Sequence, residues 1–224
     1  MTKISTRNLE LMPSPENLER ILQSLAMLDA IICPDWENRY HSFNSKWDKT
    51  TRMASMNNGS GDTYFVTFSS AGVFIKGFDH ESPMSPHAND SGSVWPGVLE
   101  EVPSAFVRFL NEPAFEMDDM TFCIWNLATD PGWRVGKIEF PAHEGNDPDG
   151  SSNLLQLFEG KPKLYRTWAE DYFEVELPLK SVQKVFAFEP LTNELIESIN
   201  PDVTLKDLKK DIAEIGYLIL KGSV

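Results

Sequence analysis

The chain is poor in cysteine, in long apolar runs and in basic residues, and each shortage excludes a class of protein. Its two cysteines, Cys33 and Cys123, lie far apart in the sequence, which excludes a small scaffold held by several disulfides. No apolar run reaches the roughly 18 residues that a membrane-spanning helix needs. The first 13 residues lack the charged and then apolar pattern of a secretion signal. We therefore expect a cytoplasmic protein with two buried free thiols and no membrane contact.

Basic residues are scarce relative to acidic ones. The 224 residues include 20 Lys and Arg against 34 Asp and Glu, for a net charge of −14. Between residues 77 and 160, fifteen acids stand against three basic residues, a net charge of −12. Such a field repels phosphate backbones, which argues against nucleic-acid binding, and it attracts a basic protein partner. The plainer alternative is a solvated surface that keeps the protein soluble.

Apolar material is plentiful by contrast. Hydrophobic residues make up 41% and aromatic residues 11% of the chain, which is enough for a packed core. Hairpin patterns follow one another without regular alternation of strand and helix. The sequence therefore predicts a single α+β domain over residues 1–224: a largely antiparallel sheet of hairpins, with an N-terminal helix and C-terminal helices packed on it.

The expected elements follow from residue spacing and turn residues. Ser14 and Pro15 suit the start of a helix, and apolar residues then repeat at helical spacing as far as Cys33. The segment 120–127 is apolar on both faces, which predicts a central strand covered on both sides. We expect further strands over 39–47, 51–56, 63–68, 73–78, 135–140, 153–158, 163–168 and 182–188, and further helices over 103–111, 191–199 and 204–215.

An internal repeat is one interpretation of two of these hairpins. Residues 51–81 and 149–170 each contain a turn with glycine, a strand, a second glycine and another strand that ends near acidic residues. Because hairpins are common, two unrelated hairpins are the alternative.

The sharpest group of metal-ligating side chains lies at a predicted strand end. Asp79, His80 and Glu81 are consecutive, and His87 follows after a few residues of a proline-rich loop that could return it to His80. Carboxylate and imidazole groups are good ligands for divalent transition metals. The spacing matches no standard metal motif, so a surface turn with ordinary hydrogen bonds is the plainer interpretation. The candidate metal ligands are Asp79, His80, Glu81 and His87.

Signatures of hydrolases and cofactor sites are absent from the sequence. It contains no Gly-x-Ser-x-Gly, no His-Glu-x-x-His and no phosphate-binding glycine loop. We therefore expect no cofactor and favour a protein that is not an enzyme. The candidate partner-binding residues are acids of the 77–160 stretch and one loop tryptophan that we expect to be exposed: Glu100, Glu101, Asp118, Asp119 and Trp95.

Two segments resemble a known family. Asn58–Phe65, with the strand that ends at Asp79–Glu81, resembles the central sheet of SUKH-type bacterial toxin-immunity proteins. Pro103–Leu110 resembles the Pro-x-x-Phe/Tyr-x-x-Phe-Leu helix of that superfamily. The resemblance covers about residues 50–110. It implies an α+β domain that binds and neutralises a toxin domain, often a nuclease.

These observations lead to three hypotheses for the function. The leading one is a non-enzymatic acidic binding protein, immunity-like, that masks a basic protein partner. The alternative is a metal-dependent hydrolase that uses Asp79, His80, Glu81 and His87. A structural or sensor role with a small ligand comes third.

Overall fold

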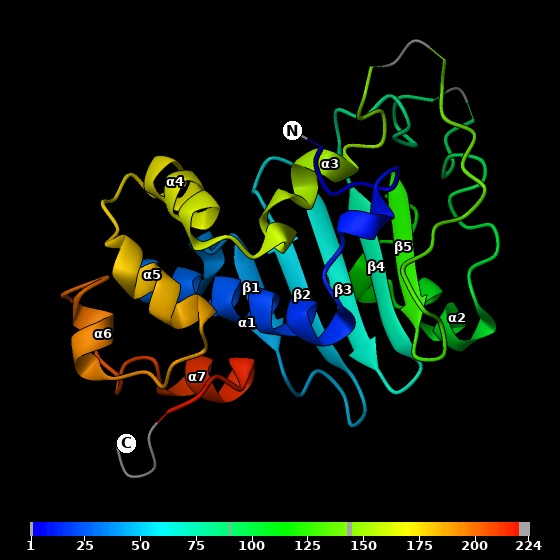
Figure 1. Cartoon of the computed structure of the whole chain (residues 1–224). Helices are drawn as coiled ribbons and strands as arrows, with labels where there is room; N and C mark the ends of the chain where they lie inside the picture. Colours follow the sequence, from blue (N-terminus) through cyan, green and yellow to red (C-terminus); the bar gives the residue numbers. More distant parts are fainter. Residues whose placement is uncertain (1, 90, 143–144, 220–224) are drawn as a thin grey trace. The chain divides into compact units, whose positions relative to one another are not determined.

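The computed structural model describes residues 2–89, 91–142 and 145–219 (Figure 1). It contains an N-terminal helix, a five-stranded antiparallel sheet and C-terminal helices, which confirms the predicted α+β class. The chain groups into two compact units. Unit 1 comprises Met1–Pro15 and Ser55–Glu159, and unit 2 comprises Glu16–Ala54 and Gly160–Val224. Within the described ranges, the structure has no helix that combines the length and the apolar character needed to span a membrane.

The strands follow their sequence order in the sheet, so each pairs with its chain neighbour. The order is β1 (His41–Asn44), β2 (Arg52–Asn57), β3 (Thr63–Ser69), β4 (Gly72–Phe78) and β5 (Phe122–Leu127). The first four strands match the predicted hairpins within a few residues. The division between the two units falls inside β2.

In unit 1, both faces of β4 are covered, and all seven of its residues are buried. On one face, Phe74 contacts Phe106 of η3 (Ser104–Phe106) and Phe109 of α2 (Val107–Leu110), with ring centroids 5.7 and 5.9 Å away. On the other face of the sheet, Tyr64 meets Phe158 of η5 (Gln156–Glu159) at 5.2 Å. Burial on both faces explains why β4 lacks the alternation typical of a half-exposed strand.

β5 is buried but lies at the end of the strand order, so the predicted central position was wrong. Its outer edge carries an isolated bridge to Arg134. The N–H of Trp125 donates to the carbonyl of Arg134 at 2.9 Å, and the N–H of Arg134 donates back at 2.8 Å. This single bridge replaces the strand expected over 135–140, which is irregular.

Unit 2 is mainly helical. The predicted N-terminal helix is α1 (Pro15–Ile32), which confirms the prediction from Pro15 and the apolar spacing. A buried carboxylate joins three elements: Oδ2 of Asp29 accepts from the backbone N–H of His41 at 2.8 Å and lies 3.0 Å from its Nδ1, and Oδ1 accepts from the hydroxyl of Tyr165 at 2.8 Å. The other elements are η2 (Trp36–Asn38), α4 (Pro162–Tyr172), α5 (Leu179–Phe186), α6 (Asn193–Glu197) and α7 (Lys209–Ile215).

Two predicted strand regions are helices. The hairpin expected over 153–168 is replaced by α3 (Ser151–Leu154), η5 and α4, so the second half of the proposed repeat is not a hairpin. Pro162 occupies the start of α4, a position that suits proline. The strand expected over 182–188 is also wrong, because this segment forms most of α5. Val182 and Val185 are both buried and lie three residues apart, which is a helical spacing. The last predicted helix, α7, ends as expected at Gly216, which adopts a left-handed conformation.

Candidate functional site

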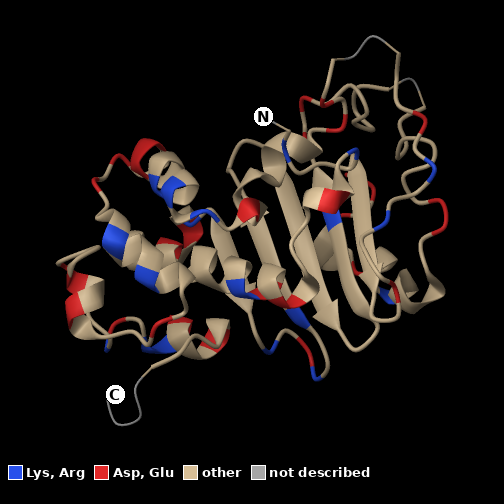
Figure 2. Ribbon diagram, in the orientation of Figure 1, with Lys and Arg blue, Asp and Glu red and all other residues tan. Residues whose placement is uncertain are grey.

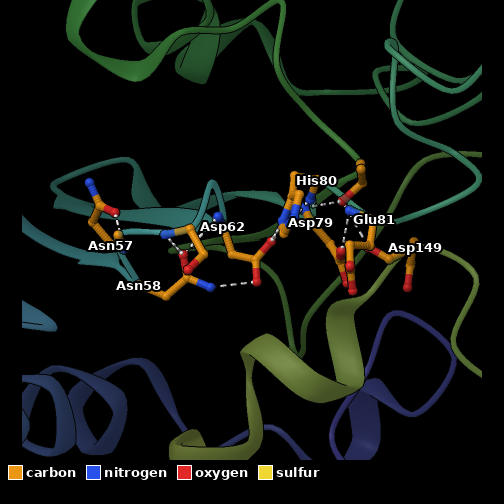
Figure 3. Close-up of polar contacts among 10 residues, drawn as sticks. Asn57, Asn58, Asp62, Asp79, His80, Glu81 and Asp149 are labelled. Carbon is orange, nitrogen blue, oxygen red and sulfur yellow. Dashed lines mark hydrogen bonds and ion pairs between the residues drawn. The ribbon is translucent and has the colours of Figure 1, made fainter. Parts of the chain in front are cut away.

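Asp62, Asp79 and His80 meet where β3 begins and β4 ends (Figure 3). One ligand atom from each lies within 4.8 Å of the others. Nδ1 of His80 lies 2.7 Å from Oδ1 of Asp62, and the backbone N–H of His80 donates to the same oxygen at 3.0 Å. The strand register pairs Thr63 with Phe78, so Asp62 stands opposite Asp79, one residue beyond the strands. We call these three residues the Asp–Asp–His cluster.

The turn before β3 holds Asp62 in place. Nδ2 of Asn58 donates to Oδ2 of Asp62 at 2.7 Å. Oδ1 of Asn58 accepts from the backbone N–H groups of Ser60 at 2.8 Å and Asp62 at 3.0 Å. Gly61 has a φ of +114°, and a Cβ there would lie 3.1 Å from Cγ of His80. The asparagine and the glycine of this turn therefore do more than reverse the chain, because they orient one carboxylate and make room for the imidazole.

Asp79 is held by hydrogen bonds to Thr121 and Glu81 and by the close approach of Gly150. Its backbone N–H donates to the hydroxyl of Thr121 at 3.1 Å, and its Oδ1 accepts from the N–H of Glu81 at 3.0 Å. Gly150 has a φ of +73°, and a Cβ built on it would lie 2.1 Å from Oδ2 of Asp79. Only glycine fits at this position without moving the carboxylate.

A third carboxylate, that of Asp149, belongs to a residue connected to the cluster through Thr121. The side chain of Asp149 accepts from the hydroxyls of Thr6 at 2.5 Å and Ser151 at 2.7 Å, and the residue is 1% exposed. The carbonyl of Asp149 accepts from the hydroxyl of Thr121 at 2.8 Å. Thr121 therefore connects the backbone of Asp79 to that of Asp149, and the turn at residues 148–149 is hydrogen-bonded to the site.

The environment raises several pKa values in this region. Burial, followed by the charge of Asp62, raises the pKa of Asp79. Burial also raises the pKa of Asp149, against the effect of its hydrogen bonds from Thr6 and Ser151. The hydrogen bond to Asp62 raises the pKa of His80. A divalent cation would have to displace the proton shared by His80 and Asp62, so any metal affinity here should increase with pH.

The structure brings only two of the four predicted metal ligands into this cluster. Glu81 contributes its backbone N–H to Asp79 but is not a member of the group of three. His87 does not return to His80: its Nε2 lies 2.7 Å from Oδ1 of Asp119, and its ring meets that of Phe78 at 5.9 Å. The sequence analysis missed Asp62, although the register of the predicted hairpin places it opposite Asp79.

A second candidate site is the segment 112–119, which we call the acidic segment. Its acids are Glu112, Glu116, Asp118 and Asp119. It follows α2 and contains η4 (Pro113–Phe115). Phe115 inside the segment and Met120 just after it are fully buried, whereas Glu116 and Asp118 are exposed. Glu116 adopts a left-handed conformation with a φ of +47°, and its carbonyl accepts from the N–H of Asp119 at 2.9 Å.

A buried lysine lies near the acidic segment. Lys76 of β4 is 0% exposed, and among the described residues its Nζ has no hydrogen-bond partner. The rings of Phe65 and Phe78 have centroids 5.6 and 5.8 Å from this nitrogen. Burial lowers the pKa of Lys76 to about 8, while the charges of Asp119 and then Glu116 act in the opposite direction. Two acids of the segment are therefore close enough to stabilise the buried ammonium.

The remaining predicted partner-binding residues lie in a different stretch of chain. Glu100 and Glu101 are exposed, and Oε1 of Glu101 lies 2.6 Å from Nζ of Lys137. Trp95 is half-buried rather than fully exposed, because its indole N–H donates to the carbonyl of Glu139 at 2.8 Å. Trp95 is thus a weaker anchor for a partner than the sequence predicts.

Several acids of the 77–160 stretch are used within unit 1. Asp149 is buried, Asp147 accepts from the N–H of Ser152 at 2.9 Å, and Asp130 pairs with Arg134 at 2.8 Å. Figure 2 shows the acids of unit 1 mainly in loops, while its strands carry little charge. Two further acids of the stretch, Asp90 and Glu144, lie outside the described residues.

Comparison with known proteins found no relative. No protein-family model, no curated protein and no solved structure matches the chain. The function therefore has to be inferred from the chemistry of these two sites.

Proposed function

We propose that this chain is a non-enzymatic binding protein that masks a basic protein partner in the manner of an immunity protein. The observation that carries the proposal is the acidic segment, in which exposed Glu116 and Asp118 lie between the buried anchors Phe115 and Met120. Carboxylates on a short, anchored segment lose little freedom on binding, so more of their attraction is available as affinity.

The charge of the segment fits a partner that itself binds phosphate. A basic nuclease domain has a positive active site, and carboxylates placed there would occupy the positions of phosphates. The sequence resemblance to SUKH-type immunity proteins supports this class of partner. The same negative field disfavours nucleic acid as a direct ligand. The two free thiols, Cys33 and Cys123, support a role in the cytoplasm.

The test begins with a pull-down from lysate of the source organism and continues with stopped-flow titration of the captured protein. We expect a basic partner whose association rate constant falls as salt rises. The double variant Glu116→Gln/Asp118→Asn should slow association about three- to ten-fold.

The matched control is Glu197→Gln/Asp202→Asn, which removes the same charge from exposed positions of unit 2. This control should leave the rate within about two-fold, because exposed charges outside an interface contribute little. A partner that is acidic, or an association rate equal in both double variants, would contradict the proposal.

A metal-dependent hydrolase is the second candidate, and the Asp–Asp–His cluster favours it. Two carboxylates and an imidazole with ligand atoms within 4.8 Å of one another can hold a divalent cation. Calorimetric titration of the chelator-treated chain with Zn²⁺ or Mn²⁺ separates the two functions. If the chain is a non-enzymatic binding protein, we expect it to bind less than one metal ion per chain.

The matched variants for this titration are His80→Gln and His87→Gln. His87 is also exposed and also lies 2.7 Å from an aspartate, but it is outside the cluster. One tightly bound metal ion per chain, lost in His80→Gln and retained in His87→Gln, would overturn the first proposal in favour of the enzyme.

A further inference from the structure

Three aromatic side chains of unit 2 form a continuous group that we call the aromatic surface: Tyr40, Trp168 and Tyr172. The ring centroid of Tyr40 lies 4.7 Å from that of Trp168 and 4.9 Å from that of Tyr172. Trp168 and Tyr172 lie on α4 and stack at 5.3 Å with 16° between their planes. Tyr172 is 42% exposed, whereas Tyr40 and Trp168 are half-buried. Exposed tyrosine and tryptophan are enriched at protein interfaces, because they present large rigid areas with few rotatable bonds.

The chain around these rings is strongly acidic. The segments 33–40 and 168–176 meet through the aromatic contacts, and together they carry six acids and one basic residue. That basic residue, Arg39, has a side chain only 7% exposed and is committed to Asp211 and to the carbonyls of Cys33 and Pro34. Just before the second segment, Arg166 is 39% exposed and pairs with Glu170. The other five acids are all exposed, so the net charge exposed here is negative. The six acids are Asp35, Glu37, Glu170, Asp171, Glu174 and Glu176.

An open hollow lies where the chain leaves α4. It has a volume of about 560 Å³ and is lined by Glu170 and Arg166 of α4 and by the connection to α5, including Glu176 and Leu177. Oε1 of Glu170 accepts from Nε of Arg166 at 2.8 Å and from the N–H of Leu177 at 2.9 Å. The charge of Glu170 is thus already paired with that of Arg166, and both residues lie on the side of α4 away from Trp168 and Tyr172, so the hollow is not part of the aromatic surface.

We propose that the aromatic surface and its surrounding carboxylates bind arginine side chains of a protein partner. A guanidinium group lies flat on an aromatic ring and is more weakly hydrated than an ammonium group, so arginine fits this surface better than lysine. Burial, followed by the charges of Asp29 and Cys33, raises the pKa of Tyr172, so its phenol stays neutral at physiological pH. This surface belongs to unit 2 and does not depend on the acidic segment of unit 1.

The test measures binding of labelled arginine and lysine nonamers to the full chain by fluorescence anisotropy at about 0.15 M salt, where long-range attraction is screened. We expect tighter binding of the arginine peptide. Tyr172→Leu should weaken that binding about two- to five-fold, the contribution of one exposed ring to a cation. Tyr172→Phe keeps the ring and should leave the affinity unchanged.

Two further variants separate this surface from the acidic segment. Glu174→Gln removes an exposed charge two residues after Tyr172 and should weaken binding of both peptides. Glu116→Gln/Asp118→Asn should leave the preference for arginine intact. The proposal is overturned if the two peptides bind equally, or if Tyr172→Leu and Tyr172→Phe have the same effect while both variants keep the wild-type melting temperature.

Discussion

Each unit buries a side chain that is charged in water, and the two side chains differ in their hydrogen bonds. In unit 2, Asp29 accepts hydrogen bonds from the backbone and ring of His41 and from the hydroxyl of Tyr165. In unit 1, Lys76 is equally buried, yet none of the described residues forms a hydrogen bond with its Nζ. The comparison teaches that burial alone does not show what a charged group does. Asp29 joins α1, β1 and α4, whereas the ammonium of Lys76 joins no elements by hydrogen bonds and lies close enough to Asp119 and Glu116 to feel their charges.

The largest expected effect is on Asp29. Replacement by alanine leaves the polar groups of His41 and Tyr165 buried without their acceptor, which should lower the free energy of unfolding by about 3–5 kcal/mol. Urea denaturation followed by circular dichroism measures this change. Asp29→Asn keeps one acceptor and should lose less. A loss below about 1 kcal/mol in Asp29→Ala would show that the three hydrogen bonds contribute little to the stability of the fold.

The opposite change is expected at Lys76. Methionine has a similar length and no charge to desolvate, so Lys76→Met should raise the free energy of unfolding at pH 7 by roughly 2–3 kcal/mol. Thermal and urea denaturation measure the gain. Lys137→Met, at a side chain that is 70% exposed, is the control and should change little. Destabilisation by Lys76→Met would mean that the ammonium has a binding partner that stabilises the fold.

The gain from Lys76→Met should depend on pH. The folded-state pKa of Lys76, about 8, lies below the ordinary value of 10.5. Between these values the unfolded chain binds more protons than the folded chain, so wild-type stability rises with pH. The advantage of the methionine variant should therefore shrink from pH 8 to pH 10.5. Denaturation of both proteins across this range measures the difference, and a constant difference would contradict the lowered pKa.

The smallest expected effect is on the exposed ion pair between Arg134 and Asp130, which serves as a reference for the two buried charges. Arg134 pairs with Asp130 at 2.8 Å, but its side chain is 58% exposed. Arg134→Ala should lower the free energy of unfolding by only about 0.3–0.5 kcal/mol, because water screens exposed ion pairs. The bridge between Trp125 and Arg134 uses backbone atoms and remains. A loss above about 1 kcal/mol would show that the side chain also supports this edge of the sheet.

The sequence predicts the strands β1–β4 and the N-terminal helix α1 better than the helices between residues 151 and 186. Turn glycines and aromatic or β-branched runs identified β3 and β4 to within a residue of their observed bounds. The error at α4 arose because a short run with Tyr165 and Trp168 was interpreted as a hairpin strand. Pro162 before it and Tyr172 after it complete a helical spacing that the run alone does not show.

The residues of the candidate sites also differ in how far the sequence alone predicts them. Asp62 could have been found from the sequence, since the register of one hairpin places it opposite Asp79. Lys76 shares a strand face with Phe74 and Phe78, which indicates burial once both faces of the sheet are known to be covered. The contact of Tyr40 with Tyr172 joins segments that are far apart in the chain, so only tertiary structure reveals it.

The bridge at the outer edge of β5 occupies backbone groups with which another strand would otherwise pair. The six residues Phe122–Leu127 are uncharged and contain no proline. Segments of this kind form cross-β fibrils when their backbone is open to another copy. The backbone of Trp125 is already paired with Arg134 in the middle of the strand. A second chain that extended the sheet at Trp125 would first have to displace residue 134, so the bridge raises the free-energy cost of pairing at the middle of this strand.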